Sequence, residues 1–228
     1  ELASVIASAC LAHDIGNPPF GHSGEDAIRA FFNGIEGHTR KIIHDAMSEN
    51  QRKDLENFEG NSNALRVLTH SYNEPEPGGY KLTYTTLASL VKYPCASSEG
   101  FNKKTGLIAT KKSGFFDPEL NTYRQIANTL GIPKIAGYEN VYARHPFVYL
   151  TEAADDICYR VIDLEDAHRL HIISLETFKE MFLPFFDNQP EVYNTREYVE
   201  QKLANINDDN QKVQYIRARW IGLMVEKL

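Results

Sequence analysis

Residues 13–25 read HDIGNPPFGHSGE and separate two segments with helical periodicity. On the amino-terminal side, Val5, Ala9 and Ala12 recur at the spacing of one helix face. The two consecutive prolines of the quoted stretch cannot continue that helix, because proline lacks an amide hydrogen and clashes with the preceding turn. We therefore expect a turn at this point, followed by a second helix whose N-cap is Ser23.

Helical periodicity continues along much of the chain. Four further segments are expected to be helical: 61–70, 84–91, 119–130 and 146–170. Alternation typical of a strand is scarce, and Tyr80–Thr85 is the best candidate for it. Residues 95–118 are rich in Gly, Ser and Lys and are expected to form a long loop. The sequence thus predicts an all-α fold around a single core, with at most one small β-hairpin.

The composition is that of an ordinary globular protein. Of 228 residues, 42% are hydrophobic, and 24 Lys and Arg against 31 Asp and Glu give a formal charge of −7. These values exclude a disordered chain, and the acidic balance argues against nucleic-acid binding driven mainly by charge. No run of about 18 apolar residues occurs, so no membrane span is expected. Three widely spaced cysteines do not form a disulfide pattern, which predicts a reducing, cytoplasmic location.

Two pairs of polar residues in the opening stretch can carry chemistry. The adjacent His13 and Asp14 stand at the end of a helix, where a ring nitrogen and a carboxylate oxygen can face one divalent cation. Such a pair alone is weak evidence, since a hydrogen-bonded core histidine is the commoner case. His22 and Glu25 stand three residues apart on one helix face, where a carboxylate can orient an imidazole for acid–base catalysis. The structural alternative is that Glu25 helps to cap its helix and His22 is simply exposed.

A second polar stretch lies in the long expected helix, where residues 152–166 read EAADDICYRVIDLED. Asp155, Tyr159 and Asp163 fall at i, i+4 and i+8, so they form one stripe of that helix. Asp155 can complete a metal site with the His-Asp pair, leaving the phenol and the last carboxylate for a polar ligand. The alternative is a solvated acidic face.

Together, HDIGNPPFGHSGE and EAADDICYRVIDLED closely resemble the HD-domain deoxyguanosine triphosphate triphosphohydrolases, bacterial relatives of the SAM-and-HD-domain dNTPase. The likeness extends through FEGNSNALRVLT, LASLVKYP, KKSGFF and RHPFVYLTEAADDI, and residues 171–228 match only loosely. The resemblance implies an all-α HD-domain core. It also implies hydrolysis of dGTP, with other deoxynucleoside triphosphates as further substrates, to deoxynucleoside and inorganic triphosphate.

The resemblance implies roles for the polar pairs. His13, Asp14 and Asp155 match the family's metal ligands for Mg²⁺ or Mn²⁺, with other transition metals as alternatives; His22 matches its catalytic histidine and Glu25 the carboxylate that orients it. The family's first metal-binding histidine belongs to a segment upstream of the His-Asp pair, and residues 1–12 contain no histidine. We therefore expect residues 1–228 to be one HD-type domain that lacks its first-histidine segment and its carboxyl-terminal part.

Five residues resemble the family's substrate contacts: Tyr159, Asp163, Lys92, Glu59 and Asn61. The phenol of Tyr159 is expected near the 2′ carbon of the sugar, where a ribonucleotide hydroxyl would clash. Asp163 is expected to accept a hydrogen bond from the 3′-hydroxyl, and Lys92 to contact the triphosphate or to be a solvated lysine. Arg66 pairs either with phosphate or with Glu59.

Two alternatives stay open at this stage. The chain is a catalytically silent module for nucleotide binding or oligomerisation, or it is another HD-family nucleotide phosphohydrolase. The resemblance also implies a homo-oligomer and a nucleotide or single-stranded DNA effector. The only basic cluster that suits such an effector is Lys103, Lys104, Lys111 and Lys112, for which a solvated loop is the simpler interpretation.

Overall fold

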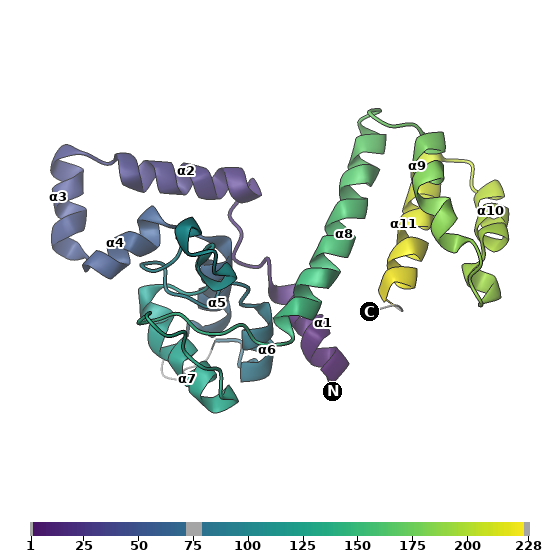
Figure 1. Ribbon diagram of the computed structural model, residues 1–228. Coiled ribbons are helices and arrows are strands. Elements are labelled where there is room, and N and C mark those ends of the chain that lie inside the picture. Colours follow the sequence, from purple (N-terminus) through teal and green to yellow (C-terminus); the bar gives the residue numbers. More distant parts are fainter. Residues whose placement is uncertain (1, 72–78, 226–228) are drawn as a thin grey trace. The chain divides into compact units, whose positions relative to one another are not determined.

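The structure is a computed structural model that describes residues 2–71 and 79–225 (Figure 1). Within these ranges helices dominate and no residue belongs to a β-strand, so the all-α prediction is confirmed. The strand for which Tyr80–Thr85 was the best candidate does not form, because helix α6 (Tyr84–Leu90) takes the last two of these residues and the Thr83 side chain caps that helix. The chain divides into two compact units, Glu1–Glu152 and Ala153–Leu228.

The first unit is built from seven helices and three short 3₁₀ turns in the part of the chain described. They are α1 (Leu2–Ala12), α2 (Gly21–Gly34), α3 (Gly37–Ala46), α4 (Glu49–Glu56), α5 (Gly60–Thr69), α6, α7 (Leu120–Leu130), η1 (Lys103–Thr105), η2 (Ile108–Thr110) and η3 (Asp117–Glu119). Their core includes the fully buried Leu65, Leu90 and Ile126. Phe115 stacks on Tyr123 with ring centroids 4.6 Å apart, which anchors the segment before α7 to this core.

The second unit contains most of the long helix α8 (Val148–Arg169), whose first turn belongs to the first unit. Its other elements are α9 (Leu175–Phe182), η4 (Leu183–Phe186), η5 (Val192–Asn194), α10 (Arg196–Ala204) and α11 (Asp209–Val225). Phe178, Phe186 and Ile216 are fully buried in a hydrophobic cluster of its own. The expectation of a single core therefore differs from the structure, while the predicted extent of the HD-type domain stays a prediction. No helix in the described part of the chain is long and apolar enough to cross a membrane.

Helix ends follow local chemistry at most positions but not at the start of α2. Gly131, in the left-handed region at φ 67°, ends α7 as expected from a glycine stop. The predicted N-cap at Ser23 is wrong: α2 begins at Gly21, and the Gly21 amide donates to the Pro18 carbonyl at 3.1 Å. A backbone turn across the two prolines thus starts the helix two residues before the serine, and Phe20 takes the N-cap position without a side-chain hydrogen bond.

The expected loop at 95–118 is a packed segment. It contains the 3₁₀ turns η1 and η2 and most of η3, and its backbone forms isolated bridges from Cys95 to Val141 and from Ala96 to Phe115. The fully buried hydroxyl of Ser113 lies 2.8 Å from that of Ser62 on α5. Buried hydroxyls that satisfy each other in this way fix the segment against the helical core.

Two buried carboxyl groups lie near one another in the first unit. Asp54 accepts hydrogen bonds from the Ser97 hydroxyl and from the amide of Asp117. Burial raises the pKa of Asp54 to about 6 and that of Glu119 to about 7. Arg66 lies 3.5 Å from Glu119, so the sequence-based pairing of Arg66 with Glu59 is corrected.

Gly16→Ala tests the close approach between the turn after α1 and helix α5. A Cβ at Gly16 would lie 2.1 Å from the amide nitrogen of Ala64 and 2.2 Å from the carbonyl oxygen of Gly60. Because backbone atoms cannot move aside, we expect a loss of about 1–3 kcal/mol or more in the free energy of unfolding, measured by urea titration. Gly34→Ala is the matched control, since its Cβ would contact nothing within 4 Å. Equal unfolding midpoints for the two variants would contradict the packing described.

Glu119→Gln tests the buried carboxyl. Its pKa of about 7 in the folded state exceeds the ordinary 4.5, so its stabilising contribution is complete below pH 4.5 and is lost as the pH rises through 7. Relative to the parent protein, we expect the variant to gain roughly 2–3 kcal/mol of stability across this window. Urea unfolding at about pH 4, 6 and 8 measures the difference. A difference that stays constant over this range would refute the assignment.

Candidate metal and catalytic site

His13 and Asp14 lie immediately after α1, where the helix opens into a turn. The amide of Asn17 donates to the Asp14 carbonyl at 3.0 Å, which closes that turn. The Nδ1 atom of His13 lies 2.7 Å from the Cys10 carbonyl oxygen. Because a carbonyl oxygen only accepts hydrogen bonds, Nδ1 carries the hydrogen and the opposite nitrogen, Nε2, is the one that can bind a cation.

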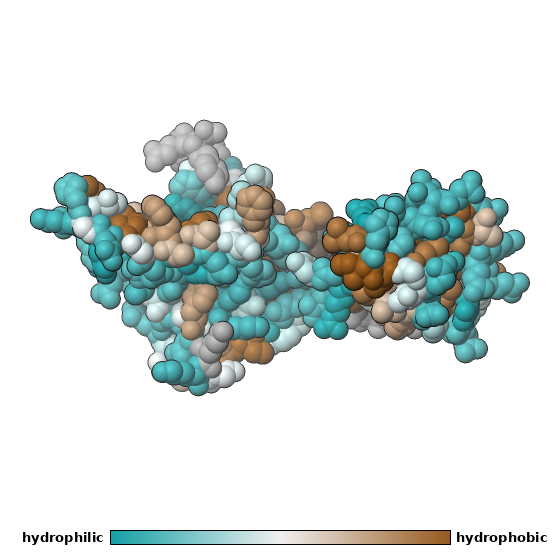
Figure 2. All heavy atoms as spheres, turned by 90° about the horizontal axis from the view of Figure 1, so that it is seen from above, coloured by the Kyte–Doolittle hydropathy of each residue, from teal (hydrophilic) through white to brown (hydrophobic). Residues whose placement is uncertain are grey.

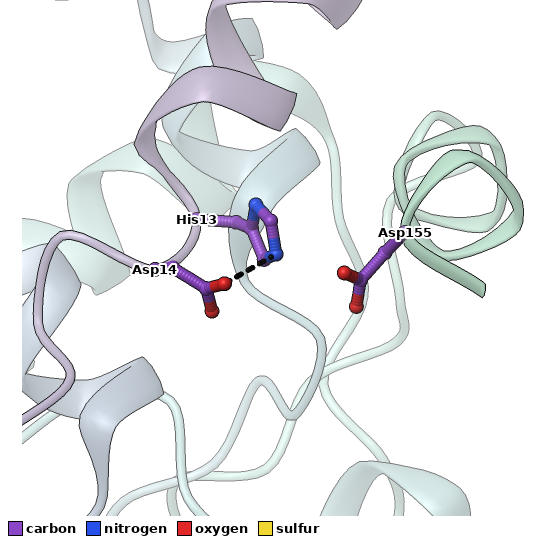
Figure 3. A group of neighbouring side chains, drawn as sticks. All are labelled: His13, Asp14 and Asp155. Carbon is purple, nitrogen blue, oxygen red and sulfur yellow. Dashed lines mark ion pairs between the residues drawn. The ribbon is translucent and has the colours of Figure 1, made fainter. Parts of the chain in front are cut away.

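The carboxylate of Asp14 faces that second nitrogen. Its Oδ2 atom lies 3.2 Å from Nε2 of His13, the ion pair drawn in Figure 3, and its Oδ1 accepts from the Asn17 side chain at 2.9 Å. The hydrogen bond with His13, which requires a hydrogen on Nε2 that a bound cation would replace, is the largest cause that holds the pKa of Asp14 below its ordinary value. The carboxylate is therefore ionised at neutral pH, as a metal ligand must be.

Asp155 is presented by helix α8. Thr151, fully buried one turn earlier, donates its hydroxyl to the Phe147 carbonyl, and Glu152 pairs with Arg144, so the start of this helix is anchored. His13, Asp14 and Asp155 each offer a ligand atom, and these atoms lie within 4.8 Å of one another (Figure 3). One imidazole nitrogen and two carboxylate oxygens are a donor set that suits Mg²⁺, Mn²⁺ and other first-row divalent metals.

His22 and Glu25 occupy the first turn of α2 but differ in environment. The side chain of His22 is exposed, whereas Glu25 is 2% exposed. The Oε1 atom of Glu25 accepts the backbone amide of Gly60 at 2.7 Å, and within the described residues no hydrogen bond joins Glu25 to His22. Glu25 therefore caps the amino end of α5 instead of its own helix. The structure thus shows no direct contact between Glu25 and His22, and the orienting role expected for Glu25 stays a prediction.

Glu25 belongs to a buried charge cluster, formed by Glu25, Arg29, Glu59 and Lys112. The Nζ atom of Lys112 lies 2.9 Å from Oε1 of Glu59 and 3.8 Å from Oε2 of Glu25. Asn61 donates its side-chain amide to the same Glu59 oxygen at 2.7 Å. Since the side chain of Glu59 is fully buried among these partners, its surroundings favour a structural role over the predicted contact with substrate. The sequence analysis missed both cations of this cluster: it did not single out Arg29, and it expected Lys112 only as part of a basic loop.

The remaining predicted substrate contacts lie at or near the surface. Tyr159 is 61% exposed and Asp163 is also exposed, one and two turns after Asp155 on α8, so their predicted common stripe is solvated. Lys92 follows α6, is half-buried and contributes to the lowered pKa of Asp14. These positions are open to a polar ligand.

Comparison with known proteins identifies similar sequences. No family model matches the chain. A deoxyguanosinetriphosphate triphosphohydrolase-like protein of Pseudomonas aeruginosa is 42% identical over 198 residues, and one of Synechocystis is 39% identical over 180. The deoxyguanosinetriphosphate triphosphohydrolase of Yersinia pestis is 34% identical over 200.

These matches cover 85%, 75% and 76% of this chain, and 42%, 39% and 36% of the respective relatives. The chain thus spans less than half the length of the curated relatives that it matches. Identity of 34–42% over three quarters or more of the chain is far above chance likeness. The chain belongs to the deoxyguanosinetriphosphate triphosphohydrolase family.

Proposed function

We propose that the protein is a metal-dependent hydrolase that cleaves dGTP, and other deoxynucleoside triphosphates, to deoxynucleoside and inorganic triphosphate. The observation that supports this proposal is the grouping of His13, Asp14 and Asp155, whose ligand atoms lie within 4.8 Å of one another. Relatives that are 31–42% identical carry the names of triphosphohydrolases or triphosphohydrolase-like proteins. In this reaction water attacks the α-phosphorus, and the bond from phosphorus to the 5′-oxygen breaks.

The residues of the proposed metal site are oriented before any cation binds. The Cys10 carbonyl fixes the ring of His13, and Asn17 holds one oxygen of Asp14. Hydrogen bonds that orient metal ligands in this way increase the affinity for the metal, because the ligand side chains lose less conformational freedom on binding. His13, Asp14 and Asp155 would hold Mg²⁺ or Mn²⁺, which would supply Lewis-acid polarisation of a phosphate oxygen.

In the proposed mechanism, His22 transfers a proton to the departing 5′-oxygen, which is a poor leaving group as an alkoxide. Its exposed position in the first turn of α2 leaves the ring accessible to substrate and solvent. Gly24 in the same turn allows the close approach of the Pro19 carbonyl oxygen, which would lie 2.1 Å from a Cβ at this position.

The proposed substrate contacts come from α8, from α5 and from the residues that follow α6. Tyr159 packs against the 2′ carbon and Asp163 accepts from the 3′-hydroxyl, both from exposed positions on α8. Lys92 contacts the triphosphate in this proposal. Asn61, the second residue of α5, also belongs to the proposed substrate pocket. Homo-oligomerisation, a nucleotide or single-stranded DNA effector and the cytoplasmic location stay predictions.

The reaction itself is tested by product analysis. The protein is incubated with dGTP and Mn²⁺, and the products are separated by anion-exchange chromatography. We expect inorganic triphosphate and deoxyguanosine in equal amounts, with no product after addition of a chelator, because the reaction requires the cation. Release of pyrophosphate would instead indicate another phosphohydrolase. Absence of product from protein shown to bind Mn²⁺ would favour the silent nucleotide-binding module.

The separate roles of the two histidines are tested by substitution. His22→Ala is expected to lower kcat by roughly 10²–10⁴-fold without loss of bound Mn²⁺, because a proton donor is removed and the ligands remain. His13→Ala is expected to lose both activity and metal. The exposed His38 on α3 provides the matched control, and His38→Ala should leave both unchanged. Equal loss of metal and turnover in His22→Ala would contradict its role.

A further inference from the structure

Helix α2 is held in place mainly by polar contacts. Of its 14 residues only Glu25 is buried, and Phe31 is 63% exposed. In the view from above, apolar side chains lie on the surface over α2 (Figure 2). No apolar side chain of α2 is fully buried, although Phe32 is half-buried. Burial of apolar side chains, which docks most helices, therefore contributes less than usual to the position of this one.

Among the residues of α2, Arg29 makes the most polar contacts with the rest of the first unit. Its Nη1 donates to the Phe58 carbonyl at 2.6 Å and lies 3.7 Å from Oε2 of Glu59. Its Nη2 lies 3.8 Å from Oε2 of Glu25, and the guanidinium stands 5.5 Å from the centroid of the Phe101 ring. One side chain on α2 thus reaches the start of α5 and the segment after α6.

The charges of the cluster balance. Two carboxylates, Glu25 and Glu59, are at most 3% exposed as side chains, and Arg29 and Lys112 are 20% and 22% exposed. The Oε2 atoms of both carboxylates are buried without a hydrogen-bond partner, so they depend on the two nearby cations. Loss of one cation would leave two buried carboxylates with a single positive charge.

We propose that Arg29 is a positioning residue for the proposed hydrolysis. By neutralising Glu25 and Glu59, it lets Glu25 cap α5 through the Gly60 amide, and this bond fixes the first turn of α2 with His22 on it. The proposal rests on the proposed function. Arg29 does not touch substrate or metal in this scheme; it acts through the placement of α2.

The kinetic test compares Arg29→Gln with a matched surface variant. We expect Arg29→Gln to lower kcat for dGTP about tenfold or more, while KM and the affinity for Mn²⁺ change less than about twofold, because a misplaced His22 affects the chemical step. Arg29→Lys, which keeps the charge, should recover most of this loss. Asp26→Asn removes only the exposed partner of Arg29, 76% exposed and 2.8 Å away, and should leave kcat unchanged. An unchanged kcat in Arg29→Gln, or an equal loss in Asp26→Asn, would overturn the proposal.

Hydrogen exchange tests the same idea without turnover. In Arg29→Gln, the amides of α2 and the Gly60 amide should exchange at least about tenfold faster than in the parent protein. The double variant Arg29→Gln/Glu59→Gln removes one charge of each sign and should restore much of the protection. If the parent protein binds Mn²⁺ but hydrolyses no triphosphate, the proposed function fails, and this comparison still decides how α2 is held. Exchange that is the same in all three proteins would refute the positioning role.

Discussion

The hydrogen bond from the Gly60 amide to the carboxylate of Glu25 holds the helix that carries the candidate catalytic His22. It joins α2 to the first turn of α5, thirty-five residues apart in sequence. A buried carboxylate is costly unless it is paired, and here Arg29 and Lys112 offset that cost. The same bond satisfies an amide at a helix start, where a negative charge also interacts favourably with the helix dipole. One contact thus caps one helix and docks another.

Features that depend on neighbouring residues could be predicted from the sequence. The glycine stop at Gly131, the helical content and the break at the two prolines follow from local backbone chemistry. The predicted N-cap at Ser23 was wrong because a serine before an apolar helix face looks the same in the sequence whether it lies at the N-cap or inside the first turn. Here the backbone turn at the two prolines starts the helix earlier, at Gly21. The strand expected at Tyr80–Thr85 failed because the Thr83 cap for α6 competes with short alternation.

Pairings between distant segments could not be predicted. Glu59 stands beside Asn61 in a motif that resembles a substrate pocket, yet its partners include Lys112 from a segment fifty-three residues away. Arg66 was expected to pair either with phosphate or with Glu59, and in the structure it lies 3.5 Å from Glu119. In both cases the sequence shows the charge but not its counter-charge, which the tertiary fold alone brings close. The orientation of His13 had a local signal, since the carbonyl that fixes its ring is Cys10, three residues earlier at a helix end.

The proposed metal ligands and the proposed catalytic histidine are held in place by different interactions. His13 and Asp14 follow α1, which packs against α6 and places Ala9 in the apolar core. Asp155 lies on α8, whose first turn contains the buried Val148 and Thr151. His22 lies on a helix whose one buried residue is a glutamate. Apolar packing tolerates a change of charge nearby, whereas a balanced buried cluster does not. In the proposed mechanism, proton transfer by His22 is therefore the step that depends most directly on the charge balance around Glu25, and metal binding is the step that depends on it least.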